Sequence, residues 1–281
     1  MLTSALLSRA SLIGMPAPNG ILTLLTDFGT RDAYVAAMKG VVLSVAPEVR
    51  IVDITHDIPP QDVMQGAFVL RDSAAHFPPG TVHVSVVDPG VGSARKAVAV
   101  GKAGQYFVGP DNGLFSLVLQ ARPDEAVVLD NPDFWRVPDP SSTFHGRDVF
   151  APAAAHLAAG IPLSELGSPL SQLTPLHWAL PIHDEQGIRG WVVHVDRFGN
   201  CVTNITREEF IGGRSKRRFK CYAGTVILDD VQPTYAAVSG GDPLLLFNST
   251  DLLEIAVSRG NAAELYGLRT GSPINVVFLD G

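Results

Sequence analysis

The chain has 281 residues, of which 46% are hydrophobic and 17% are charged, and its formal net charge is −7 at pH 7. This length and hydrophobic content suffice for a substantial core and more than one domain, and the acidic balance argues against nucleic-acid binding, which usually requires a basic face. Two cysteines are too few for a disulfide framework, and no apolar stretch reaches the roughly 18 residues that a membrane span needs. We therefore expect a cytoplasmic globular protein that binds neither nucleic acid nor membranes.

Residues 1–19 form a weakly amphipathic stretch without the long apolar centre of a secretory signal. We expect it to be an N-terminal extension outside the fold. From residue 20 to residue 181, strand and helix patterns alternate. The strands are expected at 21–25, 51–54, 82–87, 97–100, 106–108 and 127–129, and the helices at 32–45, 59–77, 113–120 and 150–159. This alternation predicts an α/β domain with a mostly parallel sheet flanked by helices.

Two of these helices carry expected start signals. Asp32 stands near the N-cap of the first, and Pro59-Pro60 opens the second. From residue 182 to residue 281 the pattern changes to short strands at close spacing, separated by turn residues. They are expected at 191–195, 201–205, 218–222, 225–228, 244–247, 252–257 and 274–278. This spacing predicts a smaller C-terminal all-β, barrel-like domain.

The most informative segment follows the third strand. A valine-rich run typical of a buried strand leads directly into Asp88-Pro89-Gly90-Val91-Gly92, and Arg95 follows. The Pro-Gly-x-Gly sequence predicts a tight loop whose backbone can approach a ligand closely. Ligands of open α/β sheets bind at the carboxyl ends of the strands, so Asp88 and Arg95 are candidate site residues, although a single Asp after a strand is more often a turn cap.

Further polar residues recur at strand ends or in glycine-containing turns. They are Asp27, Asp53, His56, Asp57, Asp111, Asn112, His145, Asp196 and Asn200. Each alone is more often a turn or cap residue than a catalyst, but together they predict a pocket at the carboxyl edge of the sheet. We expect Asp53 and His56 to brace the loop beside this pocket rather than to carry chemistry.

Several motifs of the chain resemble those of a known family, the S-adenosyl-L-methionine (SAM) hydroxide adenosyltransferases, which are related to the fluorinases. The resemblance runs from about Ile21 to the C-terminus and rests on many ordered motifs. These are Thr26–Thr30 (TDFGT), Asp53–His56 (DITH), Phe77–Val82 (FPPGTV), Val87–Gly92 (VDPGVG), Pro110–Gly113 (PDNG), Thr143–Asp148 (TFHGRD), Asp196–Asn200 (DRFGN) and Thr203–Ile205 (TNI).

The resemblance implies that water displaces methionine from SAM, giving adenosine and L-methionine with no cofactor and no metal. It also implies a homotrimer in which each active site lies at a subunit interface. The catalytic residues of the family correspond to Asp88, Arg95 and His145. A guanidinium can hold a hydroxide-like oxygen, imidazole can accept or relay a proton near neutrality, and a carboxylate can hold either the guanidinium or the water. The residue that takes the proton stays open at this point.

The substrate-binding residues implied by the resemblance come from both halves of the chain. Asp27 corresponds to the ribose-diol contact, Asp196 with help from Asp32 to the ammonium contact, and Ser249 to the carboxylate contact. In the second half, Phe198 corresponds to the residue that stacks on adenine, Asn200 to the one that reads the adenine edge, and Tyr235 to a second aromatic wall. The remaining substrate-binding positions are Gln61, Phe144 and Gly146.

Several positions depart from the fluorinases. Those enzymes have Tyr at the position of Asp88, Tyr at that of His145 and Ser at that of Gly146, together with a longer insertion between two short strands. They also have Trp at the position of Gln61 and Arg at that of Thr250. Because a carboxylate at position 88 repels a halide, the sequence favours hydrolysis over 5′-halogenation.

Two other functions stay open as alternatives. A metal-dependent phosphoesterase would use oxygen and imidazole ligands such as Asp27, Asp53, His56, Asp57 and Asp88, although the sequence lacks a closely spaced metal-ligand motif. A non-catalytic adenosine-binding protein would retain the nucleoside contacts without needing both a carboxylate at position 88 and a histidine at position 145.

Overall fold

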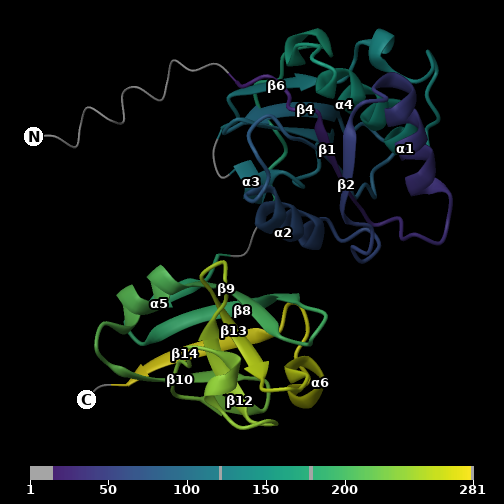
Figure 1. The fold of residues 1–281 in the computed structure, drawn as a ribbon. Helices are drawn as coiled ribbons and strands as arrows, with labels where there is room; N and C mark the ends of the chain where they lie inside the picture. Colours follow the sequence, from purple (N-terminus) through teal and green to yellow (C-terminus); the bar gives the residue numbers. More distant parts are fainter. Residues whose placement is uncertain (1–14, 120–121, 177–179, 280–281) are drawn as a thin grey trace, which may run out of the picture. The chain divides into compact units, whose positions relative to one another are not determined.

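A computed structural model describes residues 15–119, 122–176 and 180–279, and divides the chain into two compact units, Met1–His177 and Trp178–Gly281 (Figure 1). We call them unit 1 and unit 2. The domain boundary expected between residues 181 and 182 stays a prediction. Among the described residues, no helix has the length and apolar character to cross a membrane.

Unit 1 is built around one mixed sheet of order β2-β1-β3-β5-β4-β6. Its strands are β1 (Ile21–Thr26), β2 (Arg50–Thr55), β3 (Val82–Val86), β4 (Ala97–Lys102), β5 (Gln105–Pro110) and β6 (Glu125–Val128). Its α-helices are α1 (Tyr34–Val45), α2 (Val63–Ala74), α3 (Ser116–Leu119) and α4 (Ala151–Ala158), and its shorter turns are η1 (Pro132–Phe134), η2 (Gly146–Phe150) and η3 (Leu163–Glu165). Strands β2, β1, β3 and β5 are parallel, while β4 is antiparallel to both of its neighbours. The predicted α/β class is confirmed.

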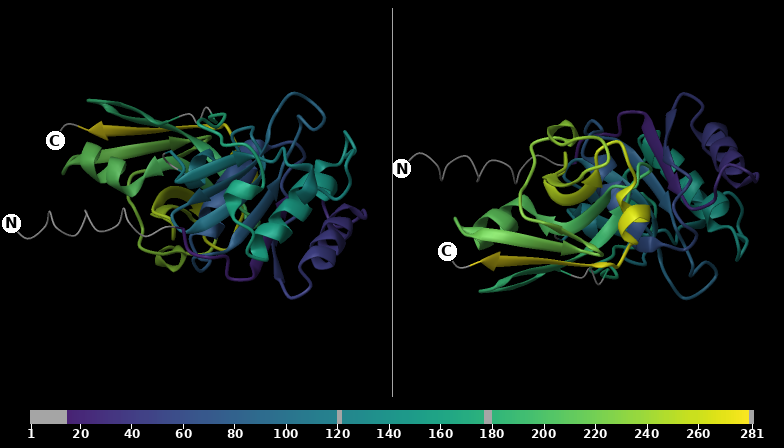
Figure 2. Two further views of the ribbon diagram at one scale, coloured as in Figure 1. Left: turned by 90° about the horizontal axis from the view of Figure 1, so that it is seen from above. Right: turned by 90° about the horizontal axis from the view of Figure 1, so that it is seen from below.

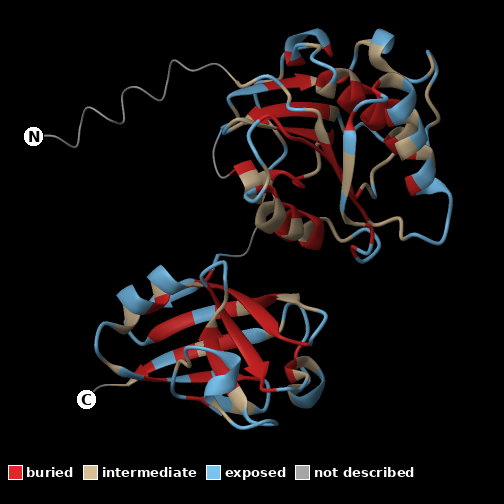
Figure 3. Cartoon of the chain, in the orientation of Figure 1, coloured by how far each residue is buried: buried red, intermediate tan, exposed pale blue. Residues whose placement is uncertain are grey.

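Alternation along the strands gives the sheet of unit 1 two apolar faces. Figure 2 shows the ribbon from two further sides, and Figure 3 shows that several strands of this sheet are buried. Val82, Val84 and Val86 of β3 share a buried cluster with residues of α1 and α4. On the opposite face, α2 and α3 cover residues such as Val98 and Phe107. Both faces of the sheet are covered. Polar side chains can therefore gather at the end of the sheet where the parallel strands finish, at their carboxyl ends.

The start of α2 differs from the sequence expectation. The helix begins at Val63 rather than at Pro59-Pro60, and Asp62 caps it by accepting a hydrogen bond from the Gln65 backbone amide at 3.0 Å. Asp32 directly precedes Ala33, the N-cap residue of α1, but no side chain caps this helix. Ahead of α4, residues 146–150 form a π-helical turn, which the apolar pattern could not distinguish from an α-helix.

Unit 2 is an antiparallel sheet of order β11-β10-β14-β8-β9-β13-β12, with β7 paired to β8. Its strands are β7 (Ile182–Asp184), β8 (Gly187–Val195), β9 (Cys201–Thr206), β10 (Arg218–Ala223), β11 (Val226–Leu228), β12 (Pro243–Phe247), β13 (Leu252–Val257) and β14 (Pro273–Leu279). Its helices are α5 (Arg207–Arg214), α6 (Ala262–Tyr266) and the short turn η4 (Tyr235–Ala237). An isolated bridge between Val231 and Leu245 joins the segment after β11 to β12, so the sheet nearly closes on itself. This confirms the predicted barrel-like fold.

Both cysteines lie inside unit 2 as free thiols. Burial raises the pKa of Cys201 to about 11 and that of Cys221 to about 12, so both are inert apolar fillers at neutral pH. Residues 15–19, which we expected in the N-terminal extension, contact unit 1. The Tyr106 hydroxyl donates to the Pro16 carbonyl at 2.7 Å, and the Asn19 side chain donates to the Pro79 carbonyl at 2.9 Å.

Candidate functional site

The carboxyl ends of three parallel strands place polar residues along one edge of unit 1. Asp27 follows β1, His56 follows β2 and Asp88 lies two residues after the end of β3. The register pairs Thr26 with Val86, so Asp27 and the β3 end emerge side by side. The fold therefore brings these polar residues to one end of the sheet, and their role in binding a ligand stays a prediction.

Asp88, Arg95 and His145 form one hydrogen-bonded cluster at this edge. The Arg95 Nε donates to both Asp88 carboxylate oxygens at 3.0 Å, and Nη2 of Arg95 also contacts Asp88 Oδ2. The same Nη2 lies 2.8 Å from His145 Nδ1. Only 9% of the Arg95 side chain and 5% of the Asp88 side chain are exposed, so solvent screens this ion pair weakly.

The hydrogen bond from Arg95 fixes the proton on His145. A guanidinium only donates, so Nδ1 of His145 accepts, and the neutral ring carries its proton on Nε2. Burial lowers the pKa of His145, and the nearby Arg95 charge lowers it further, against smaller opposite effects of Asp88 and Asp148. His145 is therefore neutral at pH 7.

Close backbone packing holds the two loops of the cluster together. Gly92 has φ +75°, and a Cβ at this position would collide with the backbone carbonyl of Ser142. On the other side, Asp148 in the π-helical turn is 1% exposed and accepts a hydrogen bond from the Ser141 backbone amide at 3.0 Å. Arg147 donates to both oxygens of Asp148 at 2.7 Å. The turn after His145 is thereby fixed to the segment that precedes it.

The predicted ribose contact, Asp27, already orders a neighbouring loop. Its Oδ2 accepts a hydrogen bond from the Gln61 backbone amide at 2.7 Å. Gln61 has φ +67°, an unusual conformation for a residue with a side chain, and such strain is common at binding sites. The structure thus brings Asp27 and Gln61 together, whereas Asp32 is an exposed residue just before α1.

Asp53 and His56 belong to a network that links β1, β2 and α1. Asp53 accepts from Lys39 Nζ at 2.6 Å and lies 3.0 Å from His56 Nε2, while Nδ1 of His56 lies 2.9 Å from Thr26 Oγ1. Burial alone would raise the pKa of Asp53, but the bonds from Lys39 and His56 hold it below its ordinary value. One member of this network, Thr26, directly precedes Asp27. The network therefore agrees with the prediction that Asp53 and His56 brace the loop beside the predicted pocket.

Phe144 forms an aromatic cluster with Phe28 and Tyr34, with ring centroids 5.9 Å and 5.2 Å from it. A hollow of about 400 Å³ lies against these rings and is also lined by Arg147. Gly146 is buried beneath them, and a Cβ there would lie 3.1 Å from Phe144 and 3.2 Å from the Met38 sulfur. A larger residue at position 146 would therefore displace the ring beside His145.

In unit 2, Asp196, Phe198 and Asn200 form a tight turn after β8. Asp196 Oδ1 accepts from the backbone amides of Phe198 at 2.8 Å and Asn200 at 2.9 Å, and Oδ2 accepts from Asn200 Nδ2 at 2.8 Å. The turn leaves the Phe198 ring 75% exposed. Both carboxylate oxygens of Asp196 thus have partners within the turn, and its contact with a substrate ammonium stays a prediction.

Tyr235 and Ser249, the other predicted residues of unit 2, lie on the turn η4 and in the loop between β12 and β13. Sequence reasoning missed Glu254, a carboxylate that is 3% exposed and accepts from the Tyr235 hydroxyl at 2.6 Å. The available signal was the charge itself, because Glu254 is the only charged residue in the apolar strand Leu252–Val257.

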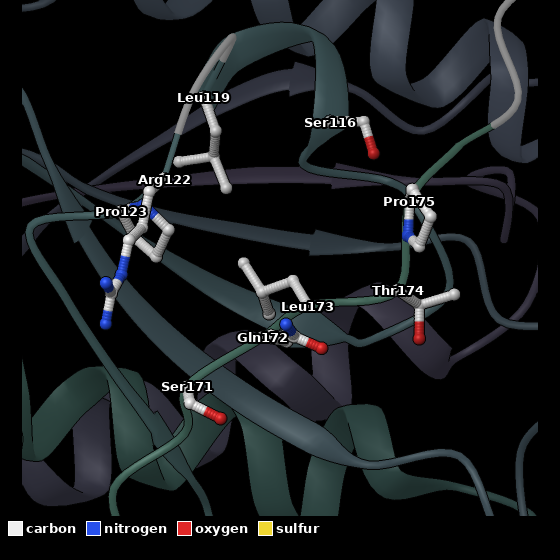
Figure 4. Close-up of a pocket in the computed structure, with 9 residues that line it drawn as sticks. All are labelled: Ser116, Leu119, Arg122, Pro123, Ser171, Gln172, Leu173, Thr174 and Pro175. Carbon is white, nitrogen blue, oxygen red and sulfur yellow. The ribbon is translucent and has the colours of Figure 1, made fainter.

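A further pocket of about 690 Å³ lies between α3 and residues 171–175 of unit 1 (Figure 4). Its described lining residues include none of those predicted for the site, and its charged lining residue is Arg122. Among the described residues, no group of three or more His, Cys, Asp or Glu side chains could hold a metal ion. The Asp88–Arg95–His145 cluster is accordingly the strongest candidate site in unit 1.

Known proteins are similar to this chain along both units. Residues 22–167 match the N-terminal domain of the SAM hydroxide adenosyltransferases, and residues 190–275 match their C-terminal domain. The chain is 42% identical over 267 residues to (R)-S-adenosyl-L-methionine hydrolase of Thermus thermophilus, covering 90% of this chain and 98% of that protein. It is 33% identical to a fluorinase of Actinoplanes sp., covering 93% of this chain and 99% of that protein.

A crystal structure of an uncharacterized conserved protein from Thermotoga maritima is also similar. It has a TM-score of 0.85 and 35% identity, covering 91% of this chain and 99% of that one. The matches therefore span both units, and the chain belongs to the SAM hydroxide adenosyltransferase family, which is related to the fluorinases.

Proposed function

We propose that this chain hydrolyses SAM to adenosine and L-methionine through in-line attack of water on the 5′ carbon of the ribose. The observation that carries the proposal is the buried cluster of Asp88, Arg95 and His145 at the carboxyl edge of the sheet. The relatives that support it are hydrolases at 35–42% identity over nearly the whole chain.

The chemistry that this cluster has to supply is limited. The leaving group is a neutral thioether, so its departure needs no general acid. The barrier arises from the weak nucleophilicity of water and from the need to align it, and positioning alone can contribute roughly 7–11 kcal/mol in well-oriented systems. A site that holds one water molecule against C5′ therefore supplies most of what the reaction lacks.

The hydrogen bonds of the cluster assign a task to each side chain. Arg95 uses Nε and Nη2 for Asp88 and His145, and its Nη1 bonds none of the described residues, so it can hold the water oxygen. A carboxylate has about four acceptor positions, so Asp88 can still accept a hydrogen from that water. His145 keeps its proton on Nε2 and can donate to the hydroxide-like oxygen as Asp88 takes the proton, when that oxygen has a third lone pair for the attack on C5′. In this proposal Asp88 is the acceptor of the proton released as the C–O bond forms.

The substrate-binding roles follow from the residues discussed above. Asp27 binds the ribose diol and Ser249 the methionine carboxylate, while Asp196, with Asp32, faces the ammonium group. Phe198 and Tyr235, which are both exposed aromatic residues of unit 2, bind the adenine faces. The remaining predicted contacts are Asn200 at the adenine edge and Gln61, Phe144 and Gly146 around the ribose.

The relatives' name specifies the (R) form of SAM, and because the amino acid is already defined as L, this descriptor refers to the sulfonium centre. We extend the same preference to this chain. Incubation with each sulfonium epimer in H₂¹⁸O, followed by mass spectrometry of adenosine, tests both the reaction and the preference. We expect ¹⁸O at the 5′ position, and unlabelled adenosine would refute attack of water at carbon.

The assay also separates the alternatives. Replacing water attack by halide attack would give a 5′-halogenated nucleoside when fluoride or chloride is added. A metal-dependent phosphoesterase would lose activity in EDTA, and a non-catalytic binding protein would bind adenosine without consuming SAM. Asp88→Ala and His145→Ala should each sharply reduce turnover, whereas Asp27→Ala should chiefly raise KM.

We further propose a cytoplasmic homotrimer in which each site takes unit 1 from one subunit and unit 2 from another. The two free, buried thiols of unit 2 agree with a reducing compartment. Light scattering measures the mass of the assembly. Mixed assemblies of Asp88→Ala and Asn200→Ala subunits should regain activity, because some sites then combine two intact halves. Monomeric active protein would refute the shared site.

A further inference from the structure

The starting observation is a buried charge on a strand of unit 2. Glu254 lies in the middle of β13, which appears as buried strand in Figure 3, and is 3% exposed. Its neighbours Leu253 and Ile255 belong to the main core cluster of the barrel. Ala256, two residues on, packs instead with Leu244, Leu246 and Val238 in a smaller cluster. Because side chains alternate along a strand, Glu254 shares the face of Ala256, outside the barrel core.

A buried carboxylate is costly unless it has a partner, and the Tyr235 hydroxyl supplies one by donating to Oε1 at 2.6 Å. The β12–β13 loop lies beside the same carboxylate, because Leu246 pairs with Glu254 and Asn248 follows two residues later. The Asn248 side-chain oxygen already accepts from the backbone amides of Thr250 at 3.0 Å and Leu252 at 3.1 Å. Its amide nitrogen is therefore the group available to the carboxylate, and the Asn248 side chain lowers the pKa of Glu254.

The Tyr235 side chain is hydrogen-bonded at its hydroxyl, while its ring faces solvent. Its ring is 43% exposed, yet its hydroxyl contacts a carboxylate that is almost fully buried. The hydroxyl oxygen lies on the long axis of the ring, so the bond to Glu254 fixes the direction of that axis. Because the phenol O–H lies in the ring plane, the position of the acceptor also restricts rotation of the ring about this axis. Burial and the Glu254 bond raise the pKa of the Tyr235 phenol, so the hydroxyl stays a donor at working pH. Such a rigid, exposed ring is suited to stacking on a planar ligand.

The turn that carries Phe198 lies close to this pair. Strand β9 begins at Cys201, directly after this turn, and its register with β13 sets Cys201 opposite Ile255 and Val202 opposite Glu254. The charge of Asp196 also raises the pKa of both Glu254 and Tyr235. Asp196 in turn fixes the backbone amide of Phe198 at 2.8 Å. Three separate segments of unit 2 therefore converge on Glu254: the turn 196–200, the turn η4 and the loop 248–250.

We infer that Glu254 is a positioning residue that sets the orientation of the Tyr235 ring and the 248–250 loop for binding of the nucleoside end of the substrate. This inference rests on the proposed function. Glu254 itself does not touch the substrate but acts through Tyr235 and Asn248. Removing the carboxylate should weaken binding while leaving the chemical step, which belongs to unit 1 residues, unchanged.

The first test is a double-mutant cycle. Glu254→Ala and Tyr235→Phe should each raise KM for SAM and the adenosine Kd by about tenfold, the size expected for one lost hydrogen bond to a charged group. The kcat should change less than twofold, and the double variant should resemble each single variant because both break the same bond. Ile255→Val, on the opposite face of β13, is the matched control, expected to lower the thermal midpoint with unchanged KM.

The second test needs no substrate and tolerates a folding defect in the alanine variant. Glu254→Gln keeps the shape of the side chain and an oxygen that accepts from Tyr235, so KM should rise less than threefold. Because the negative charge is lost, one tyrosine should ionise at lower pH, measured by absorbance at 295 nm. Tyr235→Phe should lack that transition.

The outcomes separate this inference from the proposed function. If wild-type protein forms no adenosine from SAM, the proposed function fails, and the role of Glu254 in substrate binding fails with it. If wild-type protein is active but KM is unchanged in Glu254→Ala and Tyr235→Phe, only the inference is overturned. Additive effects in the double variant, or identical tyrosine titrations in wild type and Glu254→Gln, also overturn it.

Discussion

The substitution Arg95→Lys tests whether the reaction needs only the positive charge of Arg95 or also the forked geometry of its guanidinium. The guanidinium contacts Asp88 and His145 at the same time, through Nε at 3.0 Å and Nη2 at 2.8 Å. A lysine ammonium is a compact charge on a flexible stem, and one nitrogen at the Asp88 carboxylate cannot reproduce the second direction of the fork. We expect the ion pair with Asp88 to persist and the hydrogen bond to His145 to be lost.

The size of the effect follows from that one bond. A hydrogen bond involving a charged group contributes about 1.5–3 kcal/mol. If the whole amount is lost from the transition state, kcat/KM falls roughly 10- to 150-fold, since each 1.36 kcal/mol is a factor of ten. Arg95→Met should do more, because it leaves the carboxylate of Asp88, 5% exposed, without a partner. Breaking a buried ion pair in this way costs about 3–5 kcal/mol of folding free energy.

The assay is the initial rate of adenosine formation from SAM, with urea unfolding of each variant. The matched control is Arg71→Lys, because Arg71 on α2 also contacts an aspartate, Asp72, through two nitrogens and lies over the ring of Phe68. Its kcat/KM should stay within about twofold of wild type. Wild-type kcat/KM in Arg95→Lys, or an equal loss in Arg71→Lys, would show that the fork geometry of Arg95 is not what the reaction uses.

Three further predictions concern pH and backbone geometry. The pKa of His145 lies below its ordinary value, so kcat/KM should be constant near pH 7–8 and should fall only below about pH 6.5. A pH–rate profile measures this, and a fall centred above pH 7 contradicts a neutral His145 at pH 7. Burial lowers the pKa of His83 to about 4, so the stability linked to His83 is complete above about pH 6.5 and is lost as pH falls toward 4. In urea unfolding, wild type should lose about 2 kcal/mol more stability between pH 7 and pH 5 than His83→Gln does, while the losses linked to His145 and His156 are common to both proteins. Gly92→Ala should lower kcat at least about tenfold, because the new Cβ displaces the Arg95 loop from Ser142. Gly267 also has a positive φ, +65°, but has open space around it, so Gly267→Ala should keep wild-type kcat and lose only about 1 kcal/mol of folding stability.

The sequence predicted the strands well because their patterns are local. The Val82–Val86 strand and the turn after it are readable from β-branched residues followed by Pro and Gly. The contact between Arg95 and His145 joins residues 50 positions apart, and no local pattern reveals it. Here the family resemblance supplied the triplet, and the fold supplied the reason, since the carboxyl ends of the strands share one edge.

Other features escaped prediction for identifiable reasons. Helix α2 starts at Val63, later than predicted, because the Gln61 amide bonds the Asp27 carboxylate. That contact joins segments that are distant in the sequence. Helix α5 had a readable signal, the capping box of Thr206 and Glu209, but a helix of eight residues within a strand-rich pattern is easily overlooked. The π-helical turn after His145 differs from an α-helix by one residue per turn and leaves no trace in hydrophobic spacing.

The charge balance of the cluster gives the strongest physical reason to prefer water over a halide. Arg95 and Asp88 neutralise one another, and His145 is neutral because burial and the adjacent guanidinium lower its pKa. A halide would meet no uncompensated cation there and would lie against the Asp88 carboxylate, which repels it. A water molecule offers both hydrogens and lone pairs, so it can donate to the carboxylate and accept from the guanidinium in the same place. The same cluster leaves a cationic sulfonium free to approach, because its net charge is zero.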